Sequence, residues 1–324
     1  MRDIQTYLQP RLQKVETIIR CALASDVPLL DQTNQRLREH PGKMMRPQLA
    51  LLVAGAAGEL RPDTYRYAAA VELLHNATLL HDDVVDGATL RRGLPTVASL
   101  LGGGPAVLVG DYWLVKCIQQ VLGAEDFSIR VLHLFSETLA ALTEGELLQM
   151  QKASTGDTTE EDYLRILHGK TASLFALAAR SAAISVHASP EEEEAAAGFA
   201  HRLGIAFQIK DDIFDYLDPS EALGKPVGID LREQKITQPL LCALEAAPPA
   251  EALKIRQMVT SASENPEYVA QIQAFVKTYD GVAAAGAKLE EHLQEALRCL
   301  DVFPASEEKN HLATLARYVA SRKA

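Results

Sequence analysis

The sequence has few cysteines, few aromatic residues and no excess of basic residues. Its 324 residues include 4 cysteines and 6% aromatic residues, and 43 acidic residues against 32 basic ones give a formal net charge of −11. The cysteines lie far apart with no CxxC pair, which fits free thiols in a reducing compartment better than a disulfide framework or a zinc site. Because a nucleic-acid-binding surface is broadly basic, we expect no nucleic-acid partner.

Long hydrophobic runs are missing too. The longest charge-free stretch, residues 93–110, contains two prolines and consecutive glycines, so it cannot form a membrane-spanning helix. The first residues carry no apolar signal core. We therefore expect a soluble, cytoplasmic protein without an integral membrane segment, and the hydrophobic content of 48% is ample for a folded core.

Almost every periodic segment repeats with helical spacing. One apolar stripe consists of Leu8, Leu12, Val15, Ile18 and Ile19. No alternating strand pattern of useful length occurs. Long helices rich in Ala and Leu are predicted from about residue 63 to 86 and from 190 to 218, as in a large bundle. Since no linker is long enough to divide the chain, we predict one all-α domain over residues 1–324, a single large helical bundle.

A short aspartate-rich motif, DDxxD, occurs at residues 82–86 and again at 211–215, each time at the end of an apolar helical run. Residues four apart lie on one face of a helix, so the first and last aspartates of each motif would point together. Carboxylates packed this way repel one another, and the negative end of the helix dipole adds to the penalty. A cation must compensate, and Mg²⁺ takes carboxylate and phosphate oxygens while it keeps some of its water. One copy would suit a solvated helix end equally well, whereas two copies favour a metal-bound ligand.

Other polar residues continue the line of the two motifs. At about 100° per residue, His75 lies within about 40° of the line through Asp82 and Asp86, with Thr78 beside it. On the second helix the corresponding stripe consists of Gly204, Gln208, Asp212 and Asp215. Because a buried polar stripe needs partners, each helix is predicted to face a ligand.

Basic residues flank both motifs and indicate what that ligand carries. They are Lys43 and Arg46 at an expected helix start, Arg91 and Arg92 after the first motif, Lys170 beside Thr171, and Lys225 and Lys235 after the second motif. Arginine supplies forked donors for a phosphate, and lysine supplies a point charge. The Gly169-Lys170-Thr171 step is expected to open a helix, and it is no P-loop because no glycine stands five residues before Gly169.

In this order and spacing, these segments resemble the trans-isoprenyl diphosphate synthases of the polyprenyl synthetase family, most of all the long-chain polyprenyl and octaprenyl diphosphate synthases. The resemblance runs from about residue 42 to 235. It rests on GKMMRP at 42–47, the first motif through RRGLPT at 91–96, GDY at 110–112, EGEL at 144–147, KTASLF at 170–175, FQIKDD at 207–212 and GKPVGID at 224–230. It implies the all-α isoprenoid synthase fold, a helical bundle around a central apolar cavity.

The resemblance also implies a role for each position. The metal ligands would be Asp82, Asp83, Asp86, Asp211, Asp212 and Asp215, which together would hold three Mg²⁺ ions. The isopentenyl diphosphate site would contain Lys43, Arg46, His75 and Arg92, and the allylic diphosphate site Arg91, Lys170, Thr171, Gln208, Lys225 and Lys235. The catalytic set would be Asp82, Asp86, Asp211, Lys170, Thr171 and Gln208. Two residues depart from the family pattern, since Gln234 replaces the usual Gly before Lys235 and Gln238 replaces a common Leu.

The implied reaction is the head-to-tail condensation of isopentenyl diphosphate with an allylic diphosphate. Mg²⁺ and basic side chains would neutralise the departing diphosphate, and Thr171 and Gln208 would steady the carbocation by their oxygen dipoles. Three alternatives stay open: a short-chain farnesyl or geranylgeranyl diphosphate synthase, a class I terpene cyclase, and a non-catalytic regulatory prenyltransferase subunit. A cyclase would mix Asn, Ser, Thr or Glu into the second motif, and a regulatory subunit would have lost aspartates, whereas all six are present. The family is typically dimeric, so we expect a homodimer.

Product length depends on what blocks the tunnel below the first motif. In the family, residues four and five before the first aspartate stop the growing chain early when they are aromatic. Here they are Thr78 and Ala77, both small. We therefore predict a product longer than farnesyl diphosphate, a long-chain polyprenyl diphosphate for a quinone side chain. The alternative is a floor at Tyr112 or Trp113 on the next helix.

Overall fold

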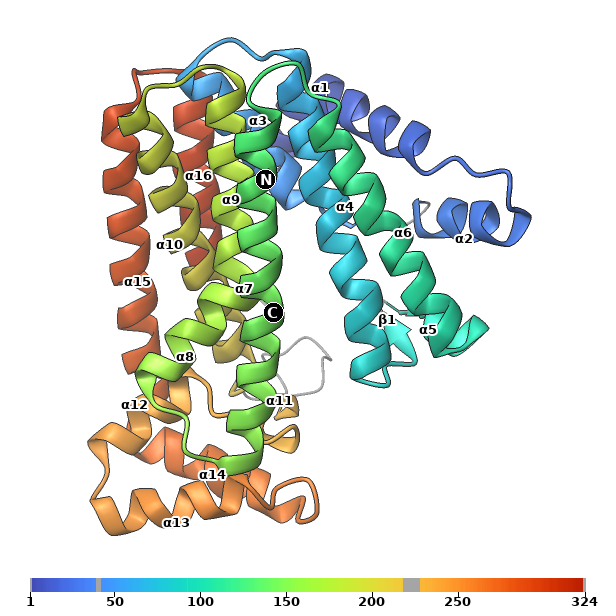
Figure 1. Ribbon diagram of the computed structural model, residues 1–324. Helices are drawn as coiled ribbons and strands as arrows, with labels where there is room; N and C mark the ends of the chain where they lie inside the picture. The colour runs from blue at the N-terminus through green and yellow to red at the C-terminus, as the bar shows by residue number, and fades with distance from the viewer. Residues whose placement is uncertain (1, 39–41, 92, 218–227, 323–324) are drawn as a thin grey trace. The chain divides into compact units, whose positions relative to one another are not determined.

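The computed structural model describes residues 2–38, 42–91, 93–217 and 228–322, and most of them are helical (Figure 1). In chain order the helices are α1 (Arg2–Ala22), α2 (Pro28–Arg38), α3 (Met45–Ala57), α4 (Pro62–Val85), α5 (Val97–Leu101), α6 (Gly103–Leu122), α7 (Ser128–Thr155), α8 (Glu160–Leu167), α9 (Ser173–Ser185), α10 (Pro190–Phe214), α11 (Ile229–Arg232), α12 (Gln238–Ala246), α13 (Pro249–Val259), α14 (Glu267–Thr278), α15 (Gly281–Cys299) and α16 (Glu307–Ser321). A π-helical turn, η1 (His168–Ala172), joins α8 to α9, and a 3₁₀ turn, η2 (Leu300–Val302), follows α15.

Strands are almost absent from the described residues. They are limited to β1 (Leu90–Arg91) and β2 (Leu94–Pro95), an antiparallel hairpin in which Leu90 pairs with Pro95. The prediction of an all-α protein is therefore confirmed. Among the described helices, none combines the length and the hydropathy that a membrane crossing requires.

The chain forms two compact units. Unit 1 comprises Met1–Ser136, Leu177–Ala196 and Val302–Leu312, and unit 2 comprises Glu137–Ala176, Ala197–Asp301 and Ala313–Ala324. The first DDxxD motif belongs to unit 1 and the second to unit 2. The single domain expected over residues 1–324 stays a prediction.

Helix α4 forms the core of unit 1, because it packs against α1, α3, α5 and α6. Figure 1 shows α4 and α6 side by side. The apolar residues of α4 are buried around the helix, among them Tyr67, Val71, Leu73 and Leu74. From α1, the predicted apolar stripe contributes three fully or largely buried side chains, those of Leu8, Val15 and Ile19. The predicted span of α4 is correct to within one residue at each end.

Helix α10 begins as predicted and ends earlier than predicted. At its start, the Ser189 hydroxyl accepts from the Glu192 backbone N–H at 3.3 Å, and the Glu192 carboxylate accepts from the Ser189 N–H at 2.8 Å. This reciprocal cap satisfies two donors that a helix start leaves unpaired. The helix ends at Phe214, and the chain then turns at residues 215–217, so the expected continuation to residue 218 is wrong for these residues.

The segment at residues 168–172 also differs from the prediction. Gly169, Lys170 and Thr171 do not open a helix; they form the π-helical turn of a helix that continues from α8 into α9. A Cβ atom added at Gly145 of α7 would lie 2.9 Å from the Gly169 Cα atom, and one added at Gly204 of α10 would lie 2.8 Å from the Ala172 Cα atom. Because these glycines have no side chain, the backbones of α7 and α10 can approach the π-helical turn this closely.

Candidate active site

The first aspartate cluster, Asp82, Asp83 and Asp86, stands at the C-terminal end of α4. The Asp86 backbone N–H donates to the Asp82 carbonyl at 2.8 Å and ends the helix. The Asp83 side chain is only 6% exposed, and its Oδ1 atom accepts from Arg91 Nε of the hairpin at 2.7 Å. Asp82 is half-buried and Asp86 is exposed. The structure thus pairs Asp83 with Arg91, a residue predicted for the diphosphate.

The remaining described residues predicted for unit 1 lie on α4, on α3 and just before α3. The Thr78 hydroxyl donates to the His75 carbonyl at 2.9 Å, and Ala77 is buried. Lys43 is exposed, and its carbonyl accepts from Gln48 Nε2 at 2.6 Å. Helix α3 begins at Met45, so the predicted helix start is confirmed, and Arg46 lies in the first turn. Two predicted residues, Arg92 and Lys225, lie outside the described residues.

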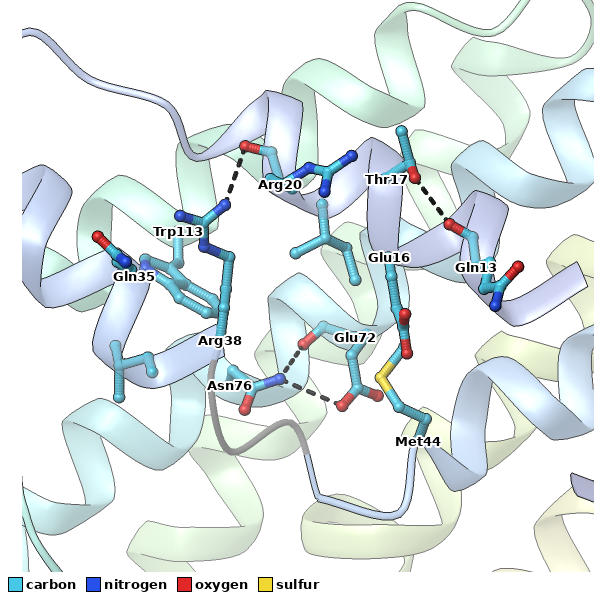
Figure 2. Close-up of a pocket in the computed structure, with 12 residues that line it drawn as sticks. Gln13, Glu16, Thr17, Arg20, Gln35, Arg38, Met44, Glu72, Asn76 and Trp113 are labelled. Atoms are coloured by element: carbon cyan, nitrogen blue, oxygen red, sulfur yellow. Dashed lines mark hydrogen bonds between the residues drawn. The ribbon is translucent and has the colours of Figure 1, made fainter. Parts of the chain in front are cut away.

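A cavity of about 790 Å³ in unit 1 is lined from α1, α2, α4 and α6 and by Met44 (Figure 2). In it, Asn76 Nδ2 donates to the Glu72 carbonyl at 2.8 Å and to the Glu72 carboxylate at 3.3 Å. Of the described residues that line it, none is a predicted catalytic or binding residue. A smaller cavity of about 90 Å³ shares Asn76 and Trp113 with it and reaches Asp83 and Arg91.

Trp113 was an alternative candidate for the tunnel floor. Its side chain is buried, and its indole N–H donates to Asn34 Oδ1 on α2 at 2.8 Å. The Asn34 amide in turn donates to the Leu23 carbonyl at 2.8 Å, so the tryptophan is anchored to the N-terminal helices. The other candidate, Tyr112, donates from its hydroxyl to the Ala24 carbonyl at 3.2 Å.

The second aspartate cluster, Asp211, Asp212 and Asp215, stands at the end of α10. Asp211 Oδ1 lies 2.8 Å from Arg322 Nη1, just beyond the end of α16. Arg322 also donates to the Phe207 carbonyl at 2.6 Å, and its guanidinium lies 3.9 Å from the centre of the Phe207 ring. The arginine is 12% exposed and Asp211 is 39% exposed, so the buried partner of this ion pair is the cation.

Asp212 is buried and has a partner on each carboxylate oxygen. The Tyr163 hydroxyl of α8 donates to Oδ2 at 2.6 Å, and Gln208 Nε2 donates to Oδ1 at 3.0 Å. Gln208 in turn accepts from the Thr171 hydroxyl at 3.2 Å. Of the predicted stripe on α10, Gln208 and Asp212 are joined by a hydrogen bond, and Gly204 serves close packing against the π-helical turn. Asp215 lies beyond the end of the helix at Phe214.

Asp215 accepts from two backbone amides at the start of α11. Its oxygens lie 2.9 Å from the Ile229 nitrogen and 3.1 Å from the Asp230 nitrogen. Burial raises the pKa of Asp215, and burial above all raises the pKa of Asp212 to about 6. Burial, with Asp212 and Asp215 nearby, raises the pKa of Asp230 to about 7. These carboxylates are therefore held where a cation would stabilise their ionised forms.

The donor set fits Mg²⁺ that is completed by other oxygens. Within the described parts of the chain, no three acidic, histidine or cysteine side chains gather closely enough to hold a metal ion by themselves. Mg²⁺ characteristically binds one or two carboxylates and takes its other ligands from phosphates and water. Each aspartate cluster by itself offers carboxylates of this kind, and a diphosphate would supply the remaining oxygens.

Lys170 projects from the π-helical turn into a polar setting. Its Nζ atom lies 2.9 Å from the Glu146 carboxylate of α7 and also donates to Gln149. A cavity of about 100 Å³ is lined by Lys170, Gln208, Asp212, Asp230 and Lys235 together with Tyr163. The structure thus brings Lys170, Thr171, Gln208, Asp212 and Lys235 together in unit 2, as predicted from the sequence.

The unusual residue before Lys235 has a structural explanation. Gln234 has a φ of 60°, a left-handed backbone conformation that favours glycine. Its side chain donates to the Thr260 carbonyl at 2.5 Å and to the Ser263 hydroxyl at 3.2 Å, which offsets the strain. The second departure, Gln238, is buried at the start of α12, and its backbone amide favours the ionised form of Asp212.

Known proteins with a similar sequence belong to one enzyme family. The family model described as "Polyprenyl synthetase" matches residues 27–276. The chain belongs to the polyprenyl synthetase family. It is 35% identical to an octaprenyl diphosphate synthase of Haemophilus influenzae over 97% of this chain and 94% of that protein. It is 32% identical to a short chain isoprenyl diphosphate synthase of Methanothermobacter thermautotrophicus over the full length of both.

Among solved structures, the chain is similar to a decaprenyl diphosphate synthase from Rhodobacter capsulatus. The TM-score is 0.92 at 33% identity, with 100% of this chain and 99% of that chain covered. The isoprenoid synthase fold expected from the sequence is thereby confirmed. Polyprenyl synthetases are generally Mg²⁺-dependent, in agreement with the two aspartate clusters.

Sequence reasoning missed several residues around the second cluster of this polyprenyl synthetase. Tyr163 and Arg322 carry no signal in the sequence, since each is an isolated residue far from the motif that it contacts. Asp230 ends the GKPVGID segment, and Glu146 belongs to the EGEL segment. Because both segments carry predicted lysines or stand close to them in the sequence, the acidic residue of each is a recognisable candidate for a lysine partner.

Proposed function

We propose that the protein is a Mg²⁺-dependent trans-prenyltransferase that condenses isopentenyl diphosphate with an allylic diphosphate to a long-chain polyprenyl diphosphate. The observation that carries the proposal is the second cluster, where Gln208 donates to the buried Asp212 and accepts from Thr171, and where Lys170 lines the same cavity as Asp212. Family membership supports the reaction, and the cysteine usage supports a reducing, cytoplasmic location.

One set of residues binds the diphosphate leaving group, and another stabilises the carbocation. Asp82, Asp83, Asp86, Asp211, Asp212 and Asp215 would hold three Mg²⁺ ions. Bound Mg²⁺ supplies Lewis-acid charge that neutralises the departing diphosphate. Lys170, Lys235, Arg91 and Lys225 bind the allylic diphosphate, and Lys43, Arg46, His75 and Arg92 bind isopentenyl diphosphate. The Thr171 and Gln208 oxygens turn their dipoles to the carbocation, and no covalent intermediate with the protein is needed.

The rival functions fit the residues less well. A class I terpene cyclase would mix other ligands into the second motif, whereas this chain repeats DDxxD. A regulatory subunit would have lost carboxylates, and its Thr171–Gln208–Asp212 hydrogen bonds would have no purpose.

The decisive experiment is turnover with and without chelator. Purified protein is incubated with isopentenyl diphosphate and farnesyl diphosphate, first in excess EDTA and then with added Mg²⁺. We expect no product in EDTA and full activity after Mg²⁺. Undiminished turnover in EDTA would exclude the proposed mechanism, and absence of product with Mg²⁺ would favour a partner-dependent or regulatory role.

For product length, we propose a chain beyond farnesyl. Relatives named octaprenyl diphosphate synthase, at 35% and 36% identity, support a long product, and a relative named for a short chain matches at 32%. Ala77 is 1% exposed and Thr78 is small, so neither forms a bulky floor beside the first cluster. Ala77→Phe and Thr78→Phe should each shorten the product, as chromatography of the dephosphorylated products would reveal. A wild-type product that stops at farnesyl, or an unchanged ladder in both variants, would move the floor to Tyr112 or Trp113.

We also propose a homodimer through α6. Leu108, Val115 and Leu122 stand seven residues apart on α6 and are 69%, 50% and 49% exposed. This spacing makes one apolar stripe on a helix, which suits a second copy of the same stripe. Sedimentation should give about twice the 35.3 kDa of one chain. The Leu108→Asp/Val115→Asp variant should sediment as a monomer, while Leu253→Asp on α13, a matched exposed leucine, should not change the mass.

A further inference from the structure

We infer that Tyr163 is a positioning residue, which acts through Asp212 and Gln208 to set the direction of the Thr171 hydroxyl. The inference rests on the proposed prenyltransfer, because it assigns Thr171 a task in that reaction. It concerns a residue of α8 to which the sequence motifs assign no role.

The hydrogen bonds that join Tyr163, Asp212, Gln208 and Thr171 form a network in which each donor and each acceptor is fixed. An ionised carboxylate only accepts, so Asp212 requires a donor on each side, the Tyr163 hydroxyl at 2.6 Å and the Gln208 amide nitrogen at 3.0 Å. With its nitrogen committed to Asp212, the Gln208 amide turns its oxygen to Thr171. The Thr171 hydroxyl then donates its only hydrogen to that oxygen, at 3.2 Å.

The consequence for Thr171 is chemical. A hydroxyl that has donated its hydrogen presents lone pairs in its remaining directions. Those lone pairs can face a carbocation or a polarised C–O bond, whereas a freely rotating hydroxyl would present its hydrogen part of the time. Electrostatic stabilisation by dipoles that are oriented in advance avoids reorganisation during the reaction.

Tyr163 is suited to hold the end of this hydrogen-bond network that lies away from Thr171. Its side chain is 2% exposed and that of Asp212 is 3% exposed, so little water can replace the bond between them. Tyr163 lies in the first turn of α8, where Thr159 and Asp162 cap each other reciprocally. Lys152 of α7 lies 2.9 Å from the Asp162 carboxylate and attaches this helix start to its neighbour.

The Thr171 end of the hydrogen-bond network is held by packing. Thr171 belongs to the π-helical turn, which Gly145 and Gly204 allow to pack closely against α7 and α10. Gln208 lies one helical turn beyond Gly204 on α10, so the close approach at Gly204 also sets the separation of Gln208 and Thr171. The hydrogen-bond network is therefore held by packed helices at both of its ends.

The test removes one oxygen atom. In Tyr163→Phe the ring stays and the donor to Asp212 is lost. We expect kcat to fall roughly tenfold, since a hydrogen bond to a charged group is worth about that factor or more. The KM for isopentenyl diphosphate should change less than about twofold. Tyr67→Phe is the matched control, because Tyr67 is a buried tyrosine of unit 1 whose hydroxyl donates to the Asp126 carbonyl at 2.7 Å.

A double-mutant cycle separates positioning from simple support of the fold. In a Thr171→Val background there is no hydroxyl to orient, so Tyr163→Phe should cost little further activity. An equal fractional loss with threonine and with valine at position 171 would overturn the inference. So would an unchanged kcat in Tyr163→Phe, or a similar loss of kcat in Tyr67→Phe.

A second readout does not depend on turnover. Mn²⁺ binding to the substrate-free protein, followed by the spin resonance of free Mn²⁺, should be the same in wild type and in Tyr163→Phe. Weaker Mn²⁺ binding in the variant would mean that Tyr163 supports a metal ligand, and would overturn the assignment to Thr171. An inactive wild type in the presence of Mg²⁺ would instead reject the proposed function itself.

Discussion

The two DDxxD motifs have the same five-residue pattern and very different surroundings. The first cluster ends α4 with one aspartate exposed and one half-buried, and its buried Asp83 pairs with Arg91, eight residues further on. The second cluster ends α10 with partners from distant segments: Tyr163 is 49 residues before Asp212, and Arg322 lies near the other end of the chain. A local motif is thus supported locally in unit 1 and by tertiary contacts in unit 2.

The two clusters also differ in how their surroundings affect the charge of the carboxylates. Burial raises the pKa of Asp212 to about 6 and, together with the neighbouring aspartates, that of Asp230 to about 7. The second cluster therefore concentrates acidic groups in a place that disfavours their charge, and a cation there gains more than at an exposed helix end.

Removal of one carboxylate from either cluster should abolish most activity. Asp82→Ala and Asp211→Ala should each lower kcat by on the order of 10²–10³-fold, as loss of electrostatic stabilisation does elsewhere. Their effects on stability should differ. Asp82→Ala relieves repulsion at a helix end, whereas Asp211→Ala deprives Arg322 of its carboxylate. Steady-state kinetics and thermal unfolding in EDTA measure both, and a higher melting temperature for Asp211→Ala would contradict the comparison.

Acid should destabilise the protein through His201 on α10. Burial first, and then His168, Arg202 and His292, lower the pKa of His201 to about 4. An unfolded histidine titrates near 6.5, so this contribution to stability is complete above about pH 6.5 and is lost as the pH falls toward about 4. The linkage amounts to about 3 kcal/mol over that window.

The pH dependence is measured as the melting temperature of wild type and of His201→Gln from pH 7 to pH 4. The wild-type curve should fall more steeply, because glutamine does not titrate. Parallel curves for the two proteins would show that His201 is not held neutral in the folded state.

Close packing at the π-helical turn should make Gly145 intolerant of a side chain. A Cβ atom there would meet the Gly169 backbone at 2.9 Å, and neither helix can yield without moving Lys170 and Thr171. Gly145→Ala should lower the free energy of unfolding by about 1–3 kcal/mol and should also reduce kcat. Gly286→Ala on α15 is the control, since nothing lies within 4 Å of its added Cβ atom. It should stabilise by about 0.5–1 kcal/mol.

Loss of the arginine charge should cost more stability in the Arg91–Asp83 pair than in the Arg322–Asp211 pair. Arg91→Met leaves the buried Asp83 without its cation and should cost about 1–3 kcal/mol of stability. Arg322→Met keeps an apolar side chain against Phe207 and leaves Asp211, which is 39% exposed, to water. It should cost less than about 1 kcal/mol. Chemical denaturation in EDTA measures both, and the reverse order would contradict the burial contrast.

The smallest effect is expected where the chain turns after each cluster. Gly87 has a φ of 61° after the first, and Gln234 has a φ of 60° after the second. Gln234→Gly relieves the strain and loses two hydrogen bonds, so stability should stay within about 1 kcal/mol of wild type. Gln234→Ala keeps the strain and loses the same bonds, and should be the less stable of the two. Equal melting temperatures of Gly and Ala variants would show that the strain is negligible.

Much of the fold could be predicted because its signals are local. The Ala- and Leu-rich runs predicted α4 to within one residue at each end, and they predicted the start of α10 at Pro190. The π-helical turn was missed because its cause is the glycine contact from α7 and α10, not a property of residues 168–172 themselves. Tyr163 was missed for a similar reason, since a single tyrosine carries no pattern and its partner lies 49 residues away.

The sequence by itself determined the helices, the two aspartate motifs, their basic neighbours and the family. The helices follow from periodicity, and the need for a cation follows from the repulsion of carboxylates four residues apart. The family follows from the resemblance of the motif segments to known proteins. Only the tertiary structure decided which aspartate is buried, which arginine pairs with it and which way Gln208 turns. Those outcomes depend on donors and acceptors that come from distant segments, and a buried polar group takes whichever partner the packing brings within hydrogen-bond distance.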